Sequence, residues 1–416
     1  MTVGLCHALG SRLRCRSVIG SVDALAGMGK QSSHDLPACA LANLDAMPRV
    51  TVVDVGDGAC TVLRCCCLGR PCGCELAVVD CGVYKGKAQG AKDKLTAVLG
   101  AEGLLRLGTV IVTHFDQDHW NGLDKLARQV RKGDIPDAVR MVYPRMPDRS
   151  LDVAALQLAL DATIAGTGVR SLDLMTTWGR VTKVIPIPVF QGCNFEAVGR
   201  AWNVLWPPQR LTSQLRRLLQ KAVDETEQLA EELAEHDHPA LRENLRIARE
   251  VGFSVQVSEP DAGVDYAEPP VEINEAPESH DVEPSNGYVN VHGDVSDVGA
   301  IPVEYREQLR KAKRSLAAAN NELSLVLHDE DGHLTVFGDI QGPSLECVLQ
   351  QSGCHSLVVL APHHGTVCVP PSFPEAEACV AQAGKHHYPH WNRHVETHDQ
   401  QRSCMTTART GTVSFW

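Results

Sequence analysis

The sequence lacks any hydrophobic run long enough to cross a membrane. Hydrophobic residues make up 44% of the 416 positions. No stretch approaches the roughly 18 uninterrupted apolar residues that a transmembrane helix requires. We therefore predict a soluble chain with no membrane association and with enough apolar residues for a substantial core. At this length the chain could form one large domain or two to three smaller ones, and no internal repeat is evident.

A secretory signal and a cysteine spacing typical of a disulfide framework are also absent. The chain has 16 cysteines, and six of them are clustered between Cys65 and Cys81. Adjacent thiols without a secretory signal favour a reducing compartment, so we predict a cytoplasmic location. The stretch "CCCLGRPCGC" could be a zinc knuckle. No second cysteine pair lies at a finger-like spacing, which favours a hairpin tip that carries thiols.

Basic residues are scarce in one segment. The net charge is −12, and 21 acidic residues against three arginines lie between Asp224 and Glu304. The rest of the chain holds 36 lysines and arginines against 30 acidic residues, so it is mildly basic and compatible with an anionic substrate. The acidic segment is a candidate surface for a protein partner.

Composition divides the chain into four parts. We predict that residues 1–46 are an extension outside the fold, because "MPRVTVVDVGDG" from Met47 has the pattern of a first strand. Residues 47–210 and 306–416 carry the strand and helix patterns of a core. Residues 211–305 form an insertion that begins as charged helices and continues as an acidic, proline-rich stretch, which predicts disorder. We therefore expect residues 212–304 to be dispensable for folding.

The stretch "THFDQDHWNG" places four potential metal ligands at the end of an apolar strand. His114, Asp116, Asp118 and His119 follow a strand predicted over Gly108–Thr113, and a helix is predicted after them. Burying such groups is costly unless they are paired or bind a metal. Imidazole and carboxylate are ligands for zinc and other divalent ions, so we interpret this turn as half of a metal site. The alternative is a polar turn in which an aspartate caps the helix.

Two further apolar strands end in ligand-type residues. "LTVFGDI" leaves Asp339 after a glycine, and "LVVLAPHHG" leaves His363 and His364 before Gly365. The carboxyl ends of strands are where open α/β sheets place their sites. Three strands with such endings predict that their side chains converge.

With these stretches the chain resembles the metallo-β-lactamase superfamily, and in particular its ComEC-like branch, which is related to the soluble domain of the DNA-internalisation competence protein. The stretches are "VVDVGDGACTVL", "VVDCG", "THFDQDHWNG", "VLWPP", "NNELSLVL", "VFGDI", "LAPHHGT" and "TARTGTVSF", and they run in family order from Val50 to Trp416. The resemblance implies an α/β fold, an αββα sandwich with the metal site at one edge of two mixed sheets.

The resemblance also implies a ligand set. His114 and Asp116 would hold one metal, Asp118 and His119 would hold the second, and Asp339 would bridge them. A histidine of "HHG" would complete the second site, with His363 preferred over His364. No histidine between Val142 and Trp206 supplies the mid-chain ligand of many relatives. One or two ions are therefore expected, with zinc favoured and manganese as the competitor, because carboxylates make the site harder.

Three functions fit this site. The first is a metal-dependent hydrolase that cleaves phosphodiester bonds with a metal-bound hydroxide, with nucleic acid among its candidate substrates and Asp118 orienting the water. The second is hydrolysis of a small ester or thioester, since one site serves many substrates in this superfamily. The third is a metal-bound module without catalysis that docks a partner.

A histidine-rich segment, "HHYPHWNRHVETH", begins at His386. We interpret it as a solvated surface loop, with lining of the pocket or phosphate binding as the alternative.

Overall fold

The structure is a computed structural model, and it describes residues 49–65, 74–84, 87–146, 148–251, 301–351, 356–399 and 403–415. The predicted N-terminal extension, the acidic proline-rich stretch and residues 66–73 of the cysteine-rich stretch, where a zinc knuckle was considered, lie outside these residues. Within the described part of the chain, no helix is long and apolar enough to span a membrane.

The first of two sheets has seven strands in the order β14-β1-β2-β3-β4-β5-β6. Its strands β14, β1, β2 and β3 pair antiparallel, and β3 to β6 pair in parallel. The bounds are β1 Arg49–Val52, β2 Cys60–Arg64, β3 Leu76–Cys81, β4 Leu107–Ile111, β5 Ala138–Pro144, β6 Lys183–Val189 and β14 Val413–Phe415.

The second sheet also has seven strands, in the order β13-β12-β11-β10-β9-β8-β7. Strands β10 to β13 pair in parallel, and β7 to β10 pair antiparallel, including the hairpin of β9 and β10. The bounds are β7 Asn194–Ala197, β8 Arg200–Trp206, β9 Val326–Asp329, β10 Leu334–Val336, β11 Ser356–Leu360, β12 Ala376–Ala381 and β13 Ser403–Thr406.

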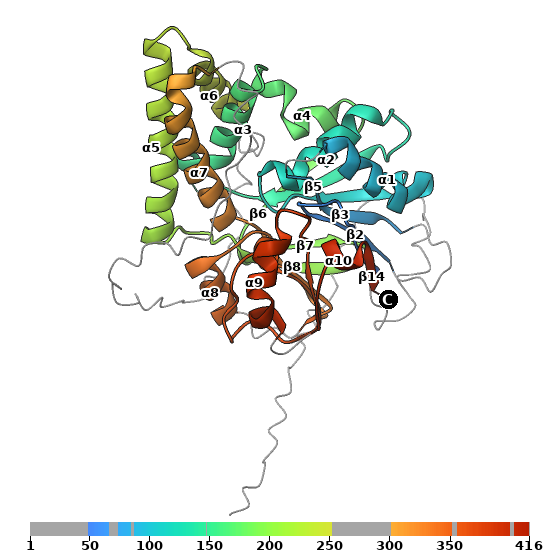
Figure 1. Cartoon of the computed structure of the whole chain (residues 1–416). Coiled ribbons are helices and arrows are strands. Elements are labelled where there is room, and N and C mark those ends of the chain that lie inside the picture. Colours follow the sequence, from blue (N-terminus) through green and yellow to red (C-terminus); the bar gives the residue numbers. More distant parts are fainter. Residues whose placement is uncertain are drawn as a thin grey trace, which may run out of the picture.

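The two sheets face each other across an apolar core and carry helices on their outer faces (Figure 1). The inner core is made of alternating strand side chains such as Val52, Ile111, Leu327 and Leu360. Helices α1 (Ala88–Leu104), α2 (Gln117–Gln129) and α4 (Leu174–Gly179) cover the first sheet, and α8 (Gly342–Gln351) and α9 (Tyr388–Asp399) lie against the second. A short helix, α10 (Thr407–Thr410), precedes β14. This layered α/β architecture confirms the predicted fold class.

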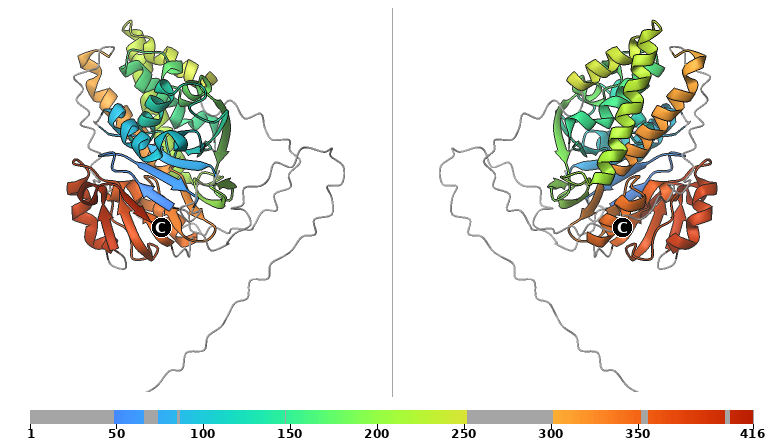
Figure 2. Two further views of the ribbon diagram at one scale, coloured as in Figure 1. Left: turned by 90° about the vertical axis from the view of Figure 1, so that its right-hand side faces the viewer. Right: turned by 90° about the vertical axis from the view of Figure 1, so that its left-hand side faces the viewer.

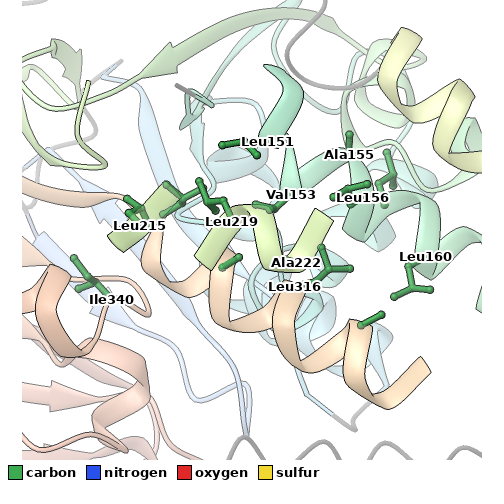
Figure 3. Close-up of a cluster of buried hydrophobic side chains, with 14 of the residues drawn as sticks. Leu151, Val153, Ala155, Leu156, Leu160, Leu215, Leu219, Ala222, Leu316 and Ile340 are labelled. Atoms are coloured by element: carbon green, nitrogen blue, oxygen red, sulfur yellow. The ribbon is translucent and has the colours of Figure 1, made fainter. Parts of the chain in front are cut away.

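A group of four helices extends from one end of the sandwich, as the side views show (Figure 2). These are α3 (Val153–Ile164), α5 (Ser213–Glu235), α6 (Ala240–Val251) and α7 (Arg306–Glu322). Leucines and alanines on their facing sides form one continuous cluster, in which Leu156, Leu219 and Leu316 are at most 1% exposed (Figure 3).

This packing leads us to expect that helices α5 and α6 contribute to folding, whereas composition alone predicted that residues 212–304 are dispensable. Helices α5 and α6 lie inside the predicted insertion, but their apolar faces are buried against α3 and α7, which belong to the two halves of the core. The heptad-like spacing of apolar residues in a charged helix is typical of a helix with one buried face. Removing α5 and α6 would expose the leucines that they cover.

The strands that position the candidate site all end at one edge of the sandwich. Strand β4 in the first sheet and strands β10 and β11 in the second carry the three predicted ligand stretches after their carboxyl ends. A hydrogen bond of 2.8 Å from the backbone N–H of Leu325 to the carbonyl of Thr113 joins the two sheets at this edge. Strand direction therefore brings segments more than 200 residues apart in sequence to the same place.

Candidate metal centre

The turn between β4 and α2 presents its polar side chains inward. His114 and His119 are each 1% exposed. Asp116 occupies the N-cap position of α2 with an extended backbone, yet its side chain makes no capping hydrogen bond. It accepts instead from the Asn320 amide of α7 at 3.3 Å. The alternative interpretation of a polar turn with a capping aspartate therefore does not describe Asp116.

Four residues from three separate segments of the chain converge on a buried centre. The Nε2 atoms of His119 and His364 lie 3.3 Å apart. His364 Nε2 lies 3.3 Å from Asp118 Oδ2 and 3.4 Å from Asp339 Oδ2, and His119 Nε2 lies 3.3 Å from Asp339 Oδ1. The ligand atoms of Asp118, His119 and His364 are all within 4.8 Å of one another, which is compact enough for one ion.

His114 and Asp339 extend the same centre on one side. The candidate ligand atoms of His114, His119 and Asp339 also lie within 4.8 Å of one another. His114 Nε2 is 3.8 Å from Asp116 Oδ2 and 4.0 Å from Asp339 Oδ2, and this buried nitrogen has no hydrogen-bond partner. A buried polar atom without a partner is costly, and a bound cation would satisfy it.

Asp80 fixes the orientation of His119. Its carboxylate accepts from His119 Nδ1 at 2.9 Å and from the Thr113 backbone N–H and hydroxyl at 2.8 and 2.7 Å. An ionised carboxylate can only accept, so Nδ1 carries the proton and Nε2 points into the centre. A carboxylate behind a histidine is the usual arrangement at metal sites, where it fixes the ring and raises its basicity.

The "HHG" turn distinguishes its two histidines. Both have positive φ, 48° at His363 and 56° at His364, a conformation that is uncommon outside glycine. This turn directs His364 into the centre, where it is 3% exposed. His363 Nδ1 instead contacts the Gln341 amide oxygen at 3.0 Å, and its Nε2 lies 3.8 Å from Asp339. The geometry therefore favours His364, in contrast to the preference for His363 drawn from the sequence.

The buried carboxylates of the centre are stabilised by positive charge around them. Burial opposes ionisation of the Asp118 and Asp339 carboxyls, but the neighbouring histidines overcome it and hold both pKa values below the usual range. Burial likewise works against the charged form of His364, yet Asp339 and Asp118 raise its pKa to about 10. The carboxylates thus favour the protonated form of His119 and His364, whereas burial lowers the pKa of His363. A divalent cation would supply the same compensating charge.

Two glycines allow the close approaches that build the centre. A Cβ at Gly82 would lie 2.4 Å from the backbone carbon of Asp118, so the turn after β3 can touch the start of α2 only without a side chain. A Cβ at Gly384 would lie 2.3 Å from the backbone nitrogen of Asp57. The Asp57 carboxylate accepts from the backbone N–H groups of His386 and His387 at 2.7 to 2.9 Å, which fixes the loop before α9.

His387 and Tyr84 line the outer side of the centre. The His387 ring stacks on His364 at 4.9 Å between centroids and on Tyr84 at 5.9 Å. Burial, together with the charge of His364, lowers the pKa of His387 to about 4. The segment interpreted as a solvated surface loop therefore forms helix α9, and the residue just before it contacts the centre.

Sequence reasoning missed several of these residues as parts of the site. Asp80 stands at the end of an apolar strand in "ELAVVD", a signal of the same kind that indicated Asp339. Asn320, Gln341 and Tyr84 carry no comparable signal, because their roles depend on which loops meet. His387 belongs to the histidine-rich segment for which lining of the pocket was the alternative interpretation. Asp116 lies at the margin of the centre with a side chain that is 21% exposed.

The residues fit a divalent metal. The Nε2 atoms of His119 and His364 face each other, and His114 Nε2 has no hydrogen-bond partner. The carboxylates of Asp118 and Asp339 complete the set. His119, His364, Asp118 and Asp339 could hold one ion, and His114, Asp116 and the shared Asp339 could hold a second with fewer ligands.

Comparisons with known proteins address the fold. Neither protein-family models nor curated proteins give a match. Among solved structures, the metallo-beta-lactamase fold protein YhfI from Bacillus subtilis is 17% identical and has a TM-score of 0.24, and the match covers 38% of this chain. The chain spans about half (52%) of the length of that structure. Two mixed sheets between helices, with a buried histidine–aspartate cluster at one edge, make this a layered α/β protein consistent with a metallo-β-lactamase-like fold.

Proposed function

We propose that this protein is a metal-dependent hydrolase that cleaves phosphodiester bonds, as a member of the ComEC-like branch of the metallo-β-lactamase superfamily. The observation that supports the proposal is the buried cluster of histidine nitrogens and carboxylates, with His114 Nε2 unpartnered. In such a cluster a divalent ion supplies Lewis acidity and makes a bound water more acidic. Zinc suits the histidines, and the aspartates make manganese its competitor.

Asp339 has the position of a shared ligand. Its carboxylate is 6% exposed and lies within 4.0 Å of ring nitrogens of His114, His119, His363 and His364. We propose that it bridges two ion positions, of which the one with Asp118, His119 and His364 binds more tightly. Metal affinity falls when a ligand is lacking, so the ion near His114 would be released first.

Asp118 is the proposed proton acceptor. Its side chain is 14% exposed, more than twice the exposure of Asp339, so one carboxylate oxygen can reach an incoming water. The interaction with His364 keeps Asp118 ionised and orients the carboxylate. A carboxylate in this position can accept the proton of the attacking water as a general base.

Metal analysis and turnover test the proposal together. The wild-type protein should copurify with one to two ions per chain and hydrolyse bis(p-nitrophenyl) phosphate. His119→Ala should lose the tight ion, and both His119→Ala and Asp118→Ala should lose activity by at least about 100-fold. His236→Ala, at the exposed end of α5, is the matched control and should retain metal and rate. Full metal content and full rate in His119→Ala would refute the site.

A substrate panel separates the candidate functions. Phosphodiester substrates would include single- and double-stranded DNA and RNA, and the other arm would contain small esters and thioesters. Turnover of esters without turnover of phosphodiesters would show that esters are the substrate class. Bound metal without turnover of any substrate would favour a docking module. A cytoplasmic location and a protein partner for the acidic segment stay predictions.

A further inference from the structure

A cavity opens at the same edge of the sandwich as the candidate metal centre. It has a volume of about 180 Å³ and is lined by Arg145, Phe190, Pro208 and Gln209. Arg145 follows β5, Phe190 follows β6, and Pro208 and Gln209 follow β8. Strands β5 and β6 run parallel to β4, and β8 runs in the same direction as β10, so their carboxyl ends lie at the same edge of the sandwich as the candidate ligands.

Arg145, on the wall of this cavity, follows the strand next to β4. Strand β5 pairs with β4, and the Val112 N–H donates to the Val142 carbonyl at 2.9 Å, just before Thr113 and His114. Neighbouring strands are about 5 Å apart and each residue advances about 3.3 Å, so the Arg145 backbone is on the order of 10 Å from that of His114. A ligand of a few linked units could reach both places.

Arg145 is arranged to receive an anion. Its guanidinium carbon lies 5.4 Å from the centre of the Phe190 ring, which supports the guanidinium plane. Among the ion pairs of the described residues, none joins Arg145 to a carboxylate. The guanidinium is always charged and presents a planar fork of N–H donors that matches phosphate geometry. Arg145 is exposed toward the cavity side of the loop, so those donors are accessible.

We propose that the Arg145–Phe190 cavity is a subsite for a second phosphate group of the substrate, next to the phosphodiester that the metal centre cleaves. This inference rests on the proposed function and deepens it, because it selects substrates with at least two neighbouring phosphates, such as short nucleic acid strands. Arg145 is a positioning and specificity residue in this arrangement, since it binds a part of the substrate that is distant from the reacting atoms.

Equilibrium binding to the full-length protein, as purified, tests the subsite without turnover. The probes are dithymidine molecules joined by a phosphorothioate, which is charged but resists hydrolysis, with no terminal phosphate, a 5′ phosphate or a 3′ phosphate. One terminal phosphate should strengthen binding to the wild type by about tenfold, the scale of one charged hydrogen-bonded pair. Arg145→Gln should abolish this gain, and Arg145→Lys should retain part of it.

Arg180→Gln is the matched control. Arg180 is also exposed, but it lies before β6 rather than after it, at the opposite edge of the sheet. It should leave the gain intact. The proposal is overturned if neither terminal phosphate strengthens wild-type binding, or if Arg145→Gln retains the gain.

Kinetics separate this inference from the proposed function. With hydrolysable dithymidine, Arg145→Gln should raise KM for the terminally phosphorylated form by about tenfold and leave kcat and the KM of the unphosphorylated form unchanged. If no dinucleotide is hydrolysed by the wild type while binding still depends on Arg145, the phosphodiesterase proposal fails and the subsite stands. If the wild type hydrolyses the dinucleotides and Arg145→Gln changes neither binding nor KM, the phosphodiesterase proposal stands and the subsite fails.

Discussion

Asp80 supports the candidate metal centre without belonging to it. Its carboxylate accepts three hydrogen bonds, and one of them fixes the tautomer of His119. Its backbone φ is 53°, a conformation that asparagine also tolerates. Asp80→Asn should therefore preserve the fold while it removes the charge behind His119. We expect metal affinity to fall about 10- to 100-fold, measured by competition with a chelator.

Asp93→Asn provides the comparison, because Asp93 is an exposed residue of α1 that pairs with Lys92. It should leave metal affinity unchanged. An unaltered affinity in Asp80→Asn would mean that His119 does not depend on this carboxylate.

The two adjacent histidines should behave differently. His364 Nε2 lies within 3.4 Å of two carboxylate oxygens, whereas His363 reaches Asp339 only at 3.8 Å and also contacts Gln341. His364→Ala should lose the tight ion, and His363→Ala should retain at least one ion per chain. Elemental analysis of the two purified variants decides between them. Loss of metal in His363→Ala together with retention in His364→Ala would restore the preference that the sequence suggested.

At the scale of elements, the end of α7 carries a buried acid. Burial raises the pKa of Glu322 to about 7, although Ser344 at the start of α8 donates a hydrogen bond to it. In the unfolded chain a glutamate has a pKa of about 4.3. The folded state therefore holds a proton that the unfolded state releases between about pH 4.3 and 7. Stability falls as pH rises through that window and stays lower above it.

Glu322→Gln should remove this loss of stability at higher pH, because glutamine does not ionise. The difference in free energy of unfolding between the variant and the wild type should increase by about 1–3 kcal/mol from pH 5 to pH 8. Denaturant titration at both pH values measures it. Glu346→Gln, exposed on α8, should show no such gain. A constant difference between Glu322→Gln and the wild type at both pH values would contradict the assignment.

At the scale of the whole molecule, the helical group couples the two halves of the chain. Leu215, Leu219 and Leu233 of α5 are at most 4% exposed and share one cluster with α3 and α7. Replacing residues 212–304 with a Gly/Ser linker should abolish cooperative unfolding, because each buried leucine that is lost costs about 2–5 kcal/mol. Replacing residues 253–300 alone, with a linker of equal length, should keep Tm within about 2 °C of the wild type.

Thermal unfolding followed by circular dichroism compares the two replacements. Cooperative unfolding of the larger replacement at the wild-type Tm would show that α5 and α6 form a separate unit. It would also restore the prediction made from composition.

The sequence alone determined many of the strands, the main helices and the three ligand stretches. A continuous apolar run located β4, and a period of 3.6 residues located the apolar face of α2, because both patterns depend on local burial. Strand direction then implied that His114, His119 and Asp339 lie at one edge, since the carboxyl ends of parallel strands share an edge.

Tertiary structure decided what local pattern does not encode. The choice of His364 over His363 depends on two residues with positive φ, and the roles of Asp80, Asn320 and His387 depend on contacts between loops far apart in sequence. The charged helices α5 and α6 appeared separable by composition, yet their apolar faces have partners on α3 and α7. A sequence pattern predicts that a face is buried, but it does not identify the surface against which the face packs. Only the tertiary structure identifies that surface, because burial involves two surfaces in contact.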